Sequence, residues 1–185
     1  MPVEGLALME RAAELNEALA ERGLADSYGL GVGRVLRVEE ESPWWEVCQT
    51  RTCAASDARM GGAPLPAMTN SGSGNQGIAS TVPVTTLAAH LGASHEELLR
   101  ALALSHATAL YIHAFLPKLS AFCAVTSAGM GAAAGMARLL GLGYGGAEMA
   151  ISTMCGDLVG MLCDGAAPSC TMKVAASVSA ATRAV

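Results

Sequence analysis

The small size of the apolar side chains is the feature that most constrains how this chain can fold. Hydrophobic residues make up 52% of the sequence, yet only 4% of residues are aromatic, whereas glycine occurs 21 times and alanine is abundant. Such small side chains fill a core only where backbones approach closely, which favours tightly packed helices. With 185 residues, the chain can bury one sizeable core. We therefore predict a single all-α domain spanning residues 1–185.

Hydrophobic periodicity and capping signals predict where the helices lie. A first helix is expected over residues 6–23 with Gly23 as its C-cap, a short extended stretch over 34–38, and a linker over 141–146. The Ser94-x-x-Glu97 capping box predicts the start of another helix. The remaining helices are expected over residues 43–60, 78–90, 94–116, 120–140 and 147–162, and from residue 173 onward.

Several functional classes do not suit this sequence. The longest apolar candidate for a membrane span, residues 122–142, is interrupted by glycines and Arg138, whereas a spanning helix needs ~20 uninterrupted apolar residues. The net charge of −5, without any cluster of Lys or Arg, argues against nucleic acid. The N-terminal segment is acidic and amphipathic, unlike a secretory or transit signal. We expect a cytoplasmic protein with neither a membrane nor a nucleic-acid partner.

Six cysteines stand out in a chain of this kind. In a cytoplasmic protein they are better interpreted as thiols, metal ligands or catalytic groups than as disulfides. Cys163 and Cys170 enclose a tight Asp-Gly-Ala-Ala-Pro-Ser turn, but the C-x₂-C pairs common in zinc sites are absent. Iron–sulfur clusters accept wider spacing because their ligands come from separate elements. From spacing alone, buried small hydrophobic residues are an equally good interpretation.

The segment APLPAMTNSGSGNQG, residues 63–77, is too rich in Pro, Gly, Ser and Asn for a regular helix or strand. Its backbone N–H groups and polar side chains could form an anion-binding nest at the start of the next helix. A flexible surface loop is the alternative. The candidate substrate-binding residues in this segment are Asn70, Ser71, Ser73, Asn75 and Gln76.

Two histidines and two lysines are further candidates. His106 and His113 lie seven residues apart on one predicted helix, and either could carry a proton, although a hydrogen-bonded core position is the better interpretation of His106. Lys118 and Lys173 are scarce charges near the cysteines and could bind a carboxylate, although surface lysines are commoner. We take His113 and Lys173 as the candidate catalytic residues.

Three long strings together carry a family resemblance: ASDARMGGAPLPAMTNSGSGNQGIASTVPV, ALALSHATALYIHAFLPKLSAFCAVTSAGMGAAAG and GMLCDGAAPSCTMKVAASVSAA. They resemble the serine dehydratase-like α-chain family, which includes L-cysteine desulfidases and iron–sulfur L-serine dehydratases. The resemblance implies a [4Fe–4S] cluster on Cys123, Cys163 and Cys170, with one iron free to act as a Lewis acid. It also implies a lyase that performs β-elimination on L-cysteine or L-serine to give pyruvate, ammonia and sulfide or water.

The same resemblance implies that residues 70–77 form the substrate loop and leaves Cys48, Cys53 and Cys155 as structural thiols. Members of the family are longer and place a proposed base upstream, so the chain resembles their C-terminal catalytic half. We expect it to form a homo-oligomer or to pair with an upstream N-terminal half. The alternatives are a catalytically incomplete fragment that serves as a helical assembly module and a zinc-binding structural domain that uses the same cysteines.

Overall fold

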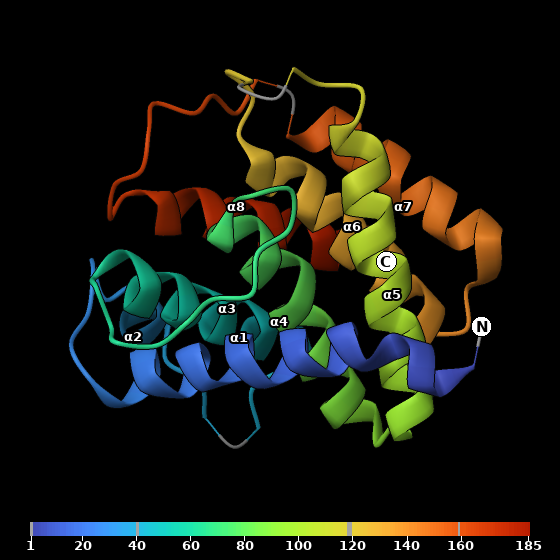
Figure 1. Cartoon of the computed structure of the whole chain (residues 1–185), viewed down its shortest axis with the longest axis horizontal. Coiled ribbons are helices and arrows are strands. Elements are labelled where there is room, and N and C mark those ends of the chain that lie inside the picture. Colours follow the sequence, from blue (N-terminus) through green and yellow to red (C-terminus); the bar gives the residue numbers. More distant parts are fainter. Residues whose placement is uncertain (1, 40, 118–119, 159) are drawn as a thin grey trace.

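The computed structural model describes residues 2–39, 41–117, 120–158 and 160–185. These residues contain eight α-helices, one short 3-10 helix and no β-strand (Figure 1). The all-α prediction is confirmed. The helices are η1 (Val3–Leu6), α1 (Ala7–Ala25), α2 (Val32–Leu36), α3 (Trp44–Met60), α4 (Gly74–Leu91), α5 (His95–His113), α6 (Ala124–Leu139), α7 (Gly143–Asp157) and α8 (Cys170–Arg183).

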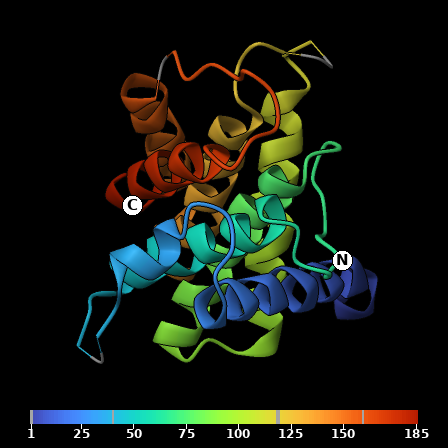
Figure 2. The ribbon, with the colours of Figure 1, turned by 90° about the vertical axis from the view of Figure 1, so that its left-hand side faces the viewer.

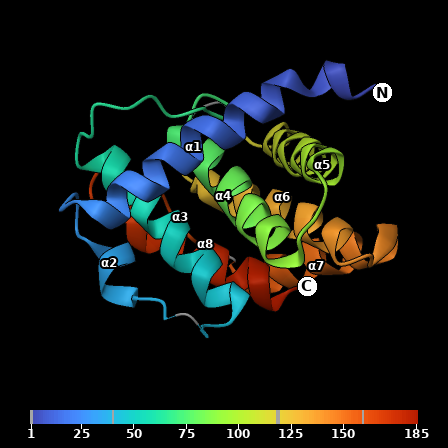
Figure 3. The ribbon, with the colours of Figure 1, turned by 90° about the horizontal axis from the view of Figure 1, so that it is seen from below.

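Helix α4 lies at the centre of the fold, where it packs against α1, α3, α5, α6 and α8 (Figure 3). Every residue from Gly74 to Ala88 is buried, so α4 has no solvent-facing stripe over this stretch. A helix buried on all sides needs small or apolar side chains all round, and Ala, Val and Thr supply them here. Pro83 lies inside α4 without ending it.

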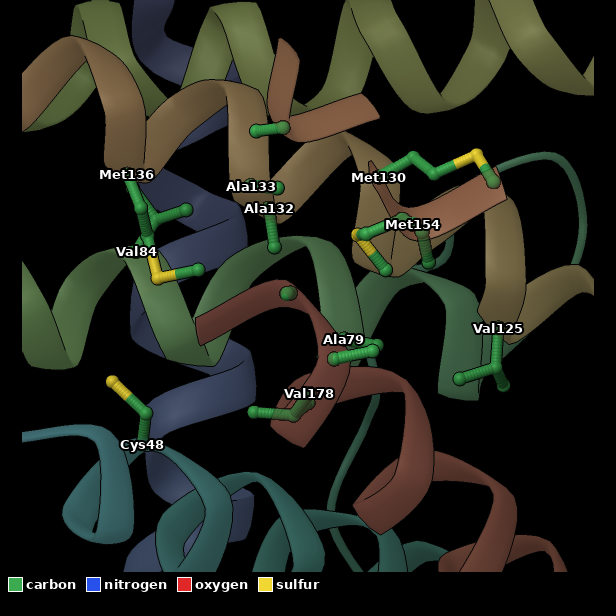
Figure 4. Packing of buried hydrophobic residues seen from close by; sticks show 14 of the residues in the cluster. Cys48, Ala79, Val84, Val125, Met130, Ala132, Ala133, Met136, Met154 and Val178 are labelled. Atoms are coloured by element: carbon green, nitrogen blue, oxygen red, sulfur yellow. The ribbon is translucent and has the colours of Figure 1, made fainter. Parts of the chain in front are cut away.

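Small side chains set the spacing of the helices around α4. The main apolar cluster is dominated by alanine, valine and methionine from α4, α6 and α8 (Figure 4). A Cβ atom at Gly131 of α6 would lie 2.3 Å from the backbone oxygen of Ser105 in α5, and one at Gly129 would lie 2.2 Å from Ser177 Oγ in α8. Only glycine permits these approaches, which confirms the expected close packing.

The structure corrects two predictions near the N-terminus. Gly23 is not a C-cap, because α1 continues to Ala25. It is buried where α1 crosses α3, and a Cβ there would lie 1.9 Å from the oxygen of Ala54. The extended stretch predicted over residues 34–38 is also wrong, since residues 32–36 form α2. The amide of Gly33 donates a 3.0 Å hydrogen bond to the Asp57 carboxylate, which holds α2 against α3.

Other helix boundaries differ because tertiary contacts decide them. Helix α4 starts at Gly74, within the segment expected to be loop, and α7 starts at Gly143, within the expected linker, and ends at Asp157. Helix α6 starts only at Ala124, because Phe122 forms an antiparallel bridge with Leu162. The capping box at Ser94 is present as predicted, although α5 ends at His113. None of the described helices combines the length and apolar content needed to cross a bilayer.

Candidate functional site

The segments that carry the predicted site residues come together at the ends of four helices. The Gln76 side chain of α4 donates a 3.3 Å hydrogen bond to Ser127 Oγ in α6. The Thr171 hydroxyl of α8 donates to Ser56 Oγ in α3 at 3.0 Å. Residues 120–123 before α6 and residues 160–163 before α8 run side by side at one end of the molecule (Figure 2). Residues distant in sequence therefore share one region.

Two backbone hydrogen bonds pair the segment that carries Cys123 with the segment that carries Cys163. The Cys123 amide donates to the oxygen of Met161 at 3.0 Å, and the Cys163 amide donates to the oxygen of Ala121 at 2.7 Å. Cys123 is the N-cap residue of α6 and is 6% exposed, whereas Cys163 is exposed. The helix prediction over 120–140 missed this pairing because a single bridge leaves no periodic signal.

The other two predicted ligands lie close enough to Cys123 to influence the pKa of its thiol. Burial raises the pKa of the Cys123 thiol, while the Val125 amide lowers it; Cys163 and Cys170 act to raise this pKa and the Lys173 ammonium to lower it. Such influence requires the groups to lie within electrostatic range of one another. Cys170 is the first residue of α8 and is half-buried. The fold thus gathers the three predicted cysteines and Lys173 in one neighbourhood.

The described residues contain no group of three or more His, Cys, Asp or Glu side chains placed to hold a single metal ion. A single zinc ion would need every sulfur within ~2.3 Å of one point. A cluster makes a less strict demand, because each thiolate binds a different iron. The donors here are three thiols, while the neighbouring Asp164 carboxylate is engaged by Lys173. Thiolates suit both zinc and iron–sulfur clusters, so the donor set is compatible with a cluster, while the described residues present no site for a single ion.

The two candidate catalytic residues, Lys173 and His113, have different surroundings in the structure. Lys173 forms an ion pair with Asp164, whose hydrogen bond raises the Lys173 pKa and keeps the ammonium protonated. This state suits anion binding and not proton abstraction. His113 ends α5, and its Nδ1 atom is buried without a partner among the described residues. No hydrogen bond or ion pair connects the described residue His113 to the cysteines, and Lys118 lies outside the described residues.

The predicted substrate loop is a structured turn. Asn70 and Ser73 exchange backbone hydrogen bonds of 3.2 and 3.0 Å, and the Ser71 hydroxyl donates to Asn70 Oδ1 at 3.1 Å. Ser73 is the N-cap of α4, where its hydroxyl accepts from the Gln76 amide at 3.4 Å. Ser71 has a φ of 50°, a left-handed conformation that is rare for a non-glycine residue. Of the loop candidates, Asn75 and Gln76 belong to the first turn of α4.

His106 anchors this loop from α5, in a position 6% exposed. The Asn70 side-chain amide donates to His106 Nδ1 at 3.1 Å and to the His106 backbone oxygen at 3.2 Å. Nδ1 must then be the acceptor, so the ring proton is on Nε2 and points to Thr81 Oγ1 at 3.0 Å. The Thr81 hydroxyl in turn donates to the oxygen of Gly77 at 2.7 Å. The bonds are consistent only with a neutral imidazole.

Asn16 of α1 completes the anchor. Its amide donates to Thr81 Oγ1 at 3.0 Å and to the oxygen of Met68 at 3.3 Å, while its Oδ1 accepts from the Met68 amide at 3.1 Å. The loop is therefore tied to α1, α4 and α5 by buried polar side chains. The core interpretation of His106 is confirmed, and the flexible-loop alternative is not supported by these bonds.

Several buried acceptors at the starts of α4 and α6 have no partner within the described part of the chain. They are Asn75 Oδ1 and Gln76 Oε1 of α4 and Thr126 Oγ1 of α6. Leaving such a group unsatisfied costs ~1–3 kcal/mol, so each calls for an explanation, and a bound ligand is one. Thr126 lies with Cys123 and Ser127 in a mainly apolar cavity of about 200 Å³, which the exposed Cys155 of α7 also lines.

Thr126, Ser127 and the Asn16–Thr81 pair have no strong signal in the sequence, because Ser, Thr and Asn on apolar helices are common. A larger cavity of about 610 Å³ lies between α5, α6 and α7. None of the predicted site residues lines it. The neutral-His anchor and the cysteine neighbourhood, rather than cavity size, mark the candidate site.

Fold and site together define an all-α domain that gathers cysteine thiols beside a polar loop. A family model described as serine dehydratase alpha chain matches residues 2–185. The chain belongs to this family.

Three of the relatives that it matches carry the name UPF0597 protein. Those from Chromobacterium violaceum and Yersinia enterocolitica are 57% and 55% identical, over all of this chain and over 44% and 43% of their own lengths. That from Cutibacterium acnes is 54% identical, over 98% of this chain and 53% of its own length. The chain thus spans about half the length of these relatives. No solved structure matches it.

Proposed function

We propose that this domain is the cluster-binding half of an iron–sulfur lyase that eliminates the β-substituent of L-serine or L-cysteine. Membership of the serine dehydratase alpha-chain family supports a related lyase-type role. The observation that carries the proposal is the contact between the cysteine segments: the Cys163 amide donates to the oxygen of Ala121, two residues before Cys123, and the Cys170 thiol donates to the oxygen of Gly165, two residues after Cys163.

Cys123, Cys163 and Cys170 would hold a [4Fe–4S] cluster, which supplies a Lewis-acidic iron for a substrate hydroxyl or thiol. Cys123 lies at the N-terminus of α6, where the Val125 amide opposes the rise in thiol pKa that burial causes, and Cys170 is the first residue of α8. The Lys173 ammonium offsets part of the negative charge. The loop residues Asn70, Ser71, Ser73, Asn75 and Gln76 would orient the substrate.

The group that removes the α-proton is not evident in the described residues. Burial raises the pKa of Cys48 to about 12 and that of Cys53 still higher, so neither thiol is a base at neutral pH. Lys173 is held protonated by Asp164. His113 remains a candidate. If His113 is not the base, we propose that the base comes from the half of the longer relatives that this chain lacks. This domain would then work in the cytoplasm as the partner of that half or as a homo-oligomer.

Anaerobic reconstitution with iron and sulfide tests the cluster. We expect bound iron and sulfide with absorption near ~400 nm, which the thiolate-ligated cluster produces. Cys163→Ser should lose the iron, whereas Cys155→Ser, in an exposed cysteine outside the proposed set, should keep it. Equal iron in both variants would show the ligand assignment to be wrong. One bound zinc in place of iron would favour the structural zinc domain.

Activity requires a separate assay. Pyruvate and sulfide release from L-cysteine, or pyruvate release from L-serine, is measured anaerobically with the reconstituted chain alone and with the remaining half of a longer relative added. We expect activity only in the second case if the base is supplied from outside. Iron binding without activity in either case would favour the helical assembly module.

A further inference from the structure

The side chain of Arg59 lies across the start of α4. Arg59 is in the last turn of α3, and Gly74 is the first residue of α4. A Cβ atom at Gly74 would lie 2.2 Å from Arg59 Nε and 2.9 Å from Cζ. The guanidinium therefore rests directly on the glycine backbone that follows the substrate loop. The absence of a side chain at Gly74 is what admits it.

Arg59 carries a charge that no carboxylate neutralises within the described ranges. Five other arginines there form ion pairs with Asp or Glu: Arg11, Arg22, Arg51, Arg100 and Arg183. The polar contact of Arg59 is with the Met60 sulfur, 3.0 Å from its Nη1 atom. Its side chain is half-buried. A half-buried guanidinium with only a thioether partner keeps its donors available for an anion.

The first turn of α4 offers complementary groups. The amides of Gly74 and Asn75 are among the N-terminal N–H groups that have no partner within a helix. Asn75 and Gln76 are 4% and 0% exposed, and their side-chain oxygens accept no hydrogen bond from the described residues. Donors that suit a carboxylate thus lie beside buried acceptors that suit an ammonium group. This pairing matches an α-amino acid in its zwitterionic form.

Helix α3 also brings this position close to the thiols. Ser56, one turn before Arg59, accepts the hydrogen bond of Thr171, the residue that follows Cys170. On the other side, Gln76 reaches Ser127 in the first turns of α6, which Cys123 caps. The start of α4 is thus bonded to α6, which Cys123 caps, and α3, which carries Arg59, is bonded to α8, which begins at Cys170.

We propose that Arg59 binds the α-carboxylate of the amino-acid substrate, together with the first amides of α4. The inference rests on the proposed function and extends it, because Arg59 would be the residue that selects amino acids with a free carboxylate. Asn75 and Gln76 would accept the α-ammonium group. The β-substituent would then face the region of the cysteines.

Nuclear magnetic resonance of the iron-free, ¹⁵N-labelled chain tests this site independently of any cluster. L-Serine is titrated while the Arg59 Nε–H and the amides of Gly74 and Asn75 are followed. We expect saturating shifts with L-serine and at least about tenfold weaker binding of L-serinamide, which lacks the carboxylate, because a charge-assisted bidentate contact is lost. Absence of shifts with L-serine, or equal affinity for the two compounds, would overturn the proposal.

Substitutions separate binding from a packing role. Arg59→Gln should weaken L-serine about tenfold to a hundredfold and remove the preference over L-serinamide, while Arg59→Lys should lose less because it keeps a point charge. Gly74→Ala should produce the same loss without unfolding, since its Cβ displaces the flexible end of Arg59. Arg100→Gln, which removes an arginine paired with Glu96, is the matched control and should bind L-serine like the wild type.

The outcomes also distinguish this proposal from the cluster proposal. Loss of affinity for both compounds to the same degree in Arg59→Gln would assign Arg59 to packing alone. Wild-type affinity in that variant would exclude it from the site. L-Serine binding at Arg59 in a chain that fails to take up iron would retain the carboxylate site and refute the cluster, whereas iron uptake without these shifts would do the reverse.

Discussion

The stability of this domain should fall between pH 7.5 and pH 5.0 because of His106. Burial lowers the pKa of His106 from 6.5 to about 4. Above pH 6.5 the ring is neutral in both the folded and the unfolded chain, so its contribution to stability is fully present. Between pH 6.5 and 4 the unfolded chain binds a proton that the folded chain does not, and stability falls. Below about pH 4 the folded ring is protonated too, and the loss levels off.

The size of this effect follows from the same pKa values. At about 1.4 kcal/mol for each tenfold change in proton affinity, the full shift corresponds to about 3 kcal/mol, of which about 2 kcal/mol is lost by pH 5.0. The hydrogen bonds supply the structural reason, because a proton on Nδ1 would face the Asn70 amide donor. Protonation would therefore break the anchor of the loop as well as charge a buried ring.

Urea unfolding followed by circular dichroism at the two pH values measures the loss. With an m-value of about 2 kcal/mol/M, the midpoint should move by roughly 1 M urea in the wild type. His106→Gln should be less stable than the wild type at pH 7.5. Between the two pH values, its urea midpoint should change by roughly 1 M less than the wild-type midpoint does. His90→Gln, in an exposed histidine, is the matched control and should retain the wild-type change. Equal pH dependence in wild type and His106→Gln would refute the neutral, buried assignment.

Two further substitutions test the fold. Gly131→Ala places a Cβ 2.3 Å from the backbone oxygen of Ser105, so α5 and α6 must separate, and we expect about 1–3 kcal/mol of destabilisation in urea unfolding; a stability gain, as for Gly→Ala in an exposed helix, would contradict the packing argument. Ser94→Ala removes half of the capping box with Glu97 and should cost about 0.5–2 kcal/mol, visible as a lower thermal midpoint by circular dichroism; an unchanged midpoint would show that α5 starts independently of this cap.

Sequence patterns predicted what local chemistry controls. The capping box at Ser94 and the start of α3 after Pro43 were both predictable, because a hydroxyl or a proline at a helix start acts on its immediate neighbours. The small-residue composition also predicted the close helix packing. Gly23 shows where the reasoning fails, since a glycine that admits another backbone has the same local signature as a glycine that ends a helix.

Predictions of the site show the same division. The family resemblance implies Cys123, Cys163 and Cys170 as ligands, which stays a prediction, and the structure shows only that the segments carrying them adjoin. The sequence could not show that Asp164 keeps Lys173 protonated, or that His106 ties down Asn70, because these contacts join residues up to 36 positions apart. Arg59 gave only a weak signal, since the availability of its charge depends on which carboxylates the fold brings near.

The placement of the three cysteines indicates that they do not contribute equally. Cys123 and Cys170 lie at the starts of α6 and α8 and are buried and half-buried, whereas Cys163 is exposed on a loop whose backbone bonds to Ala121. A ligand on such a segment gains less preorganisation from the fold, so its iron is the more easily released. Partial oxidation of a reconstituted cluster should first release the iron that has no protein ligand, and further iron loss should then begin at the iron held by Cys163. Alkylation with iodoacetamide should then modify Cys163 before Cys123, and the opposite order would contradict this ranking.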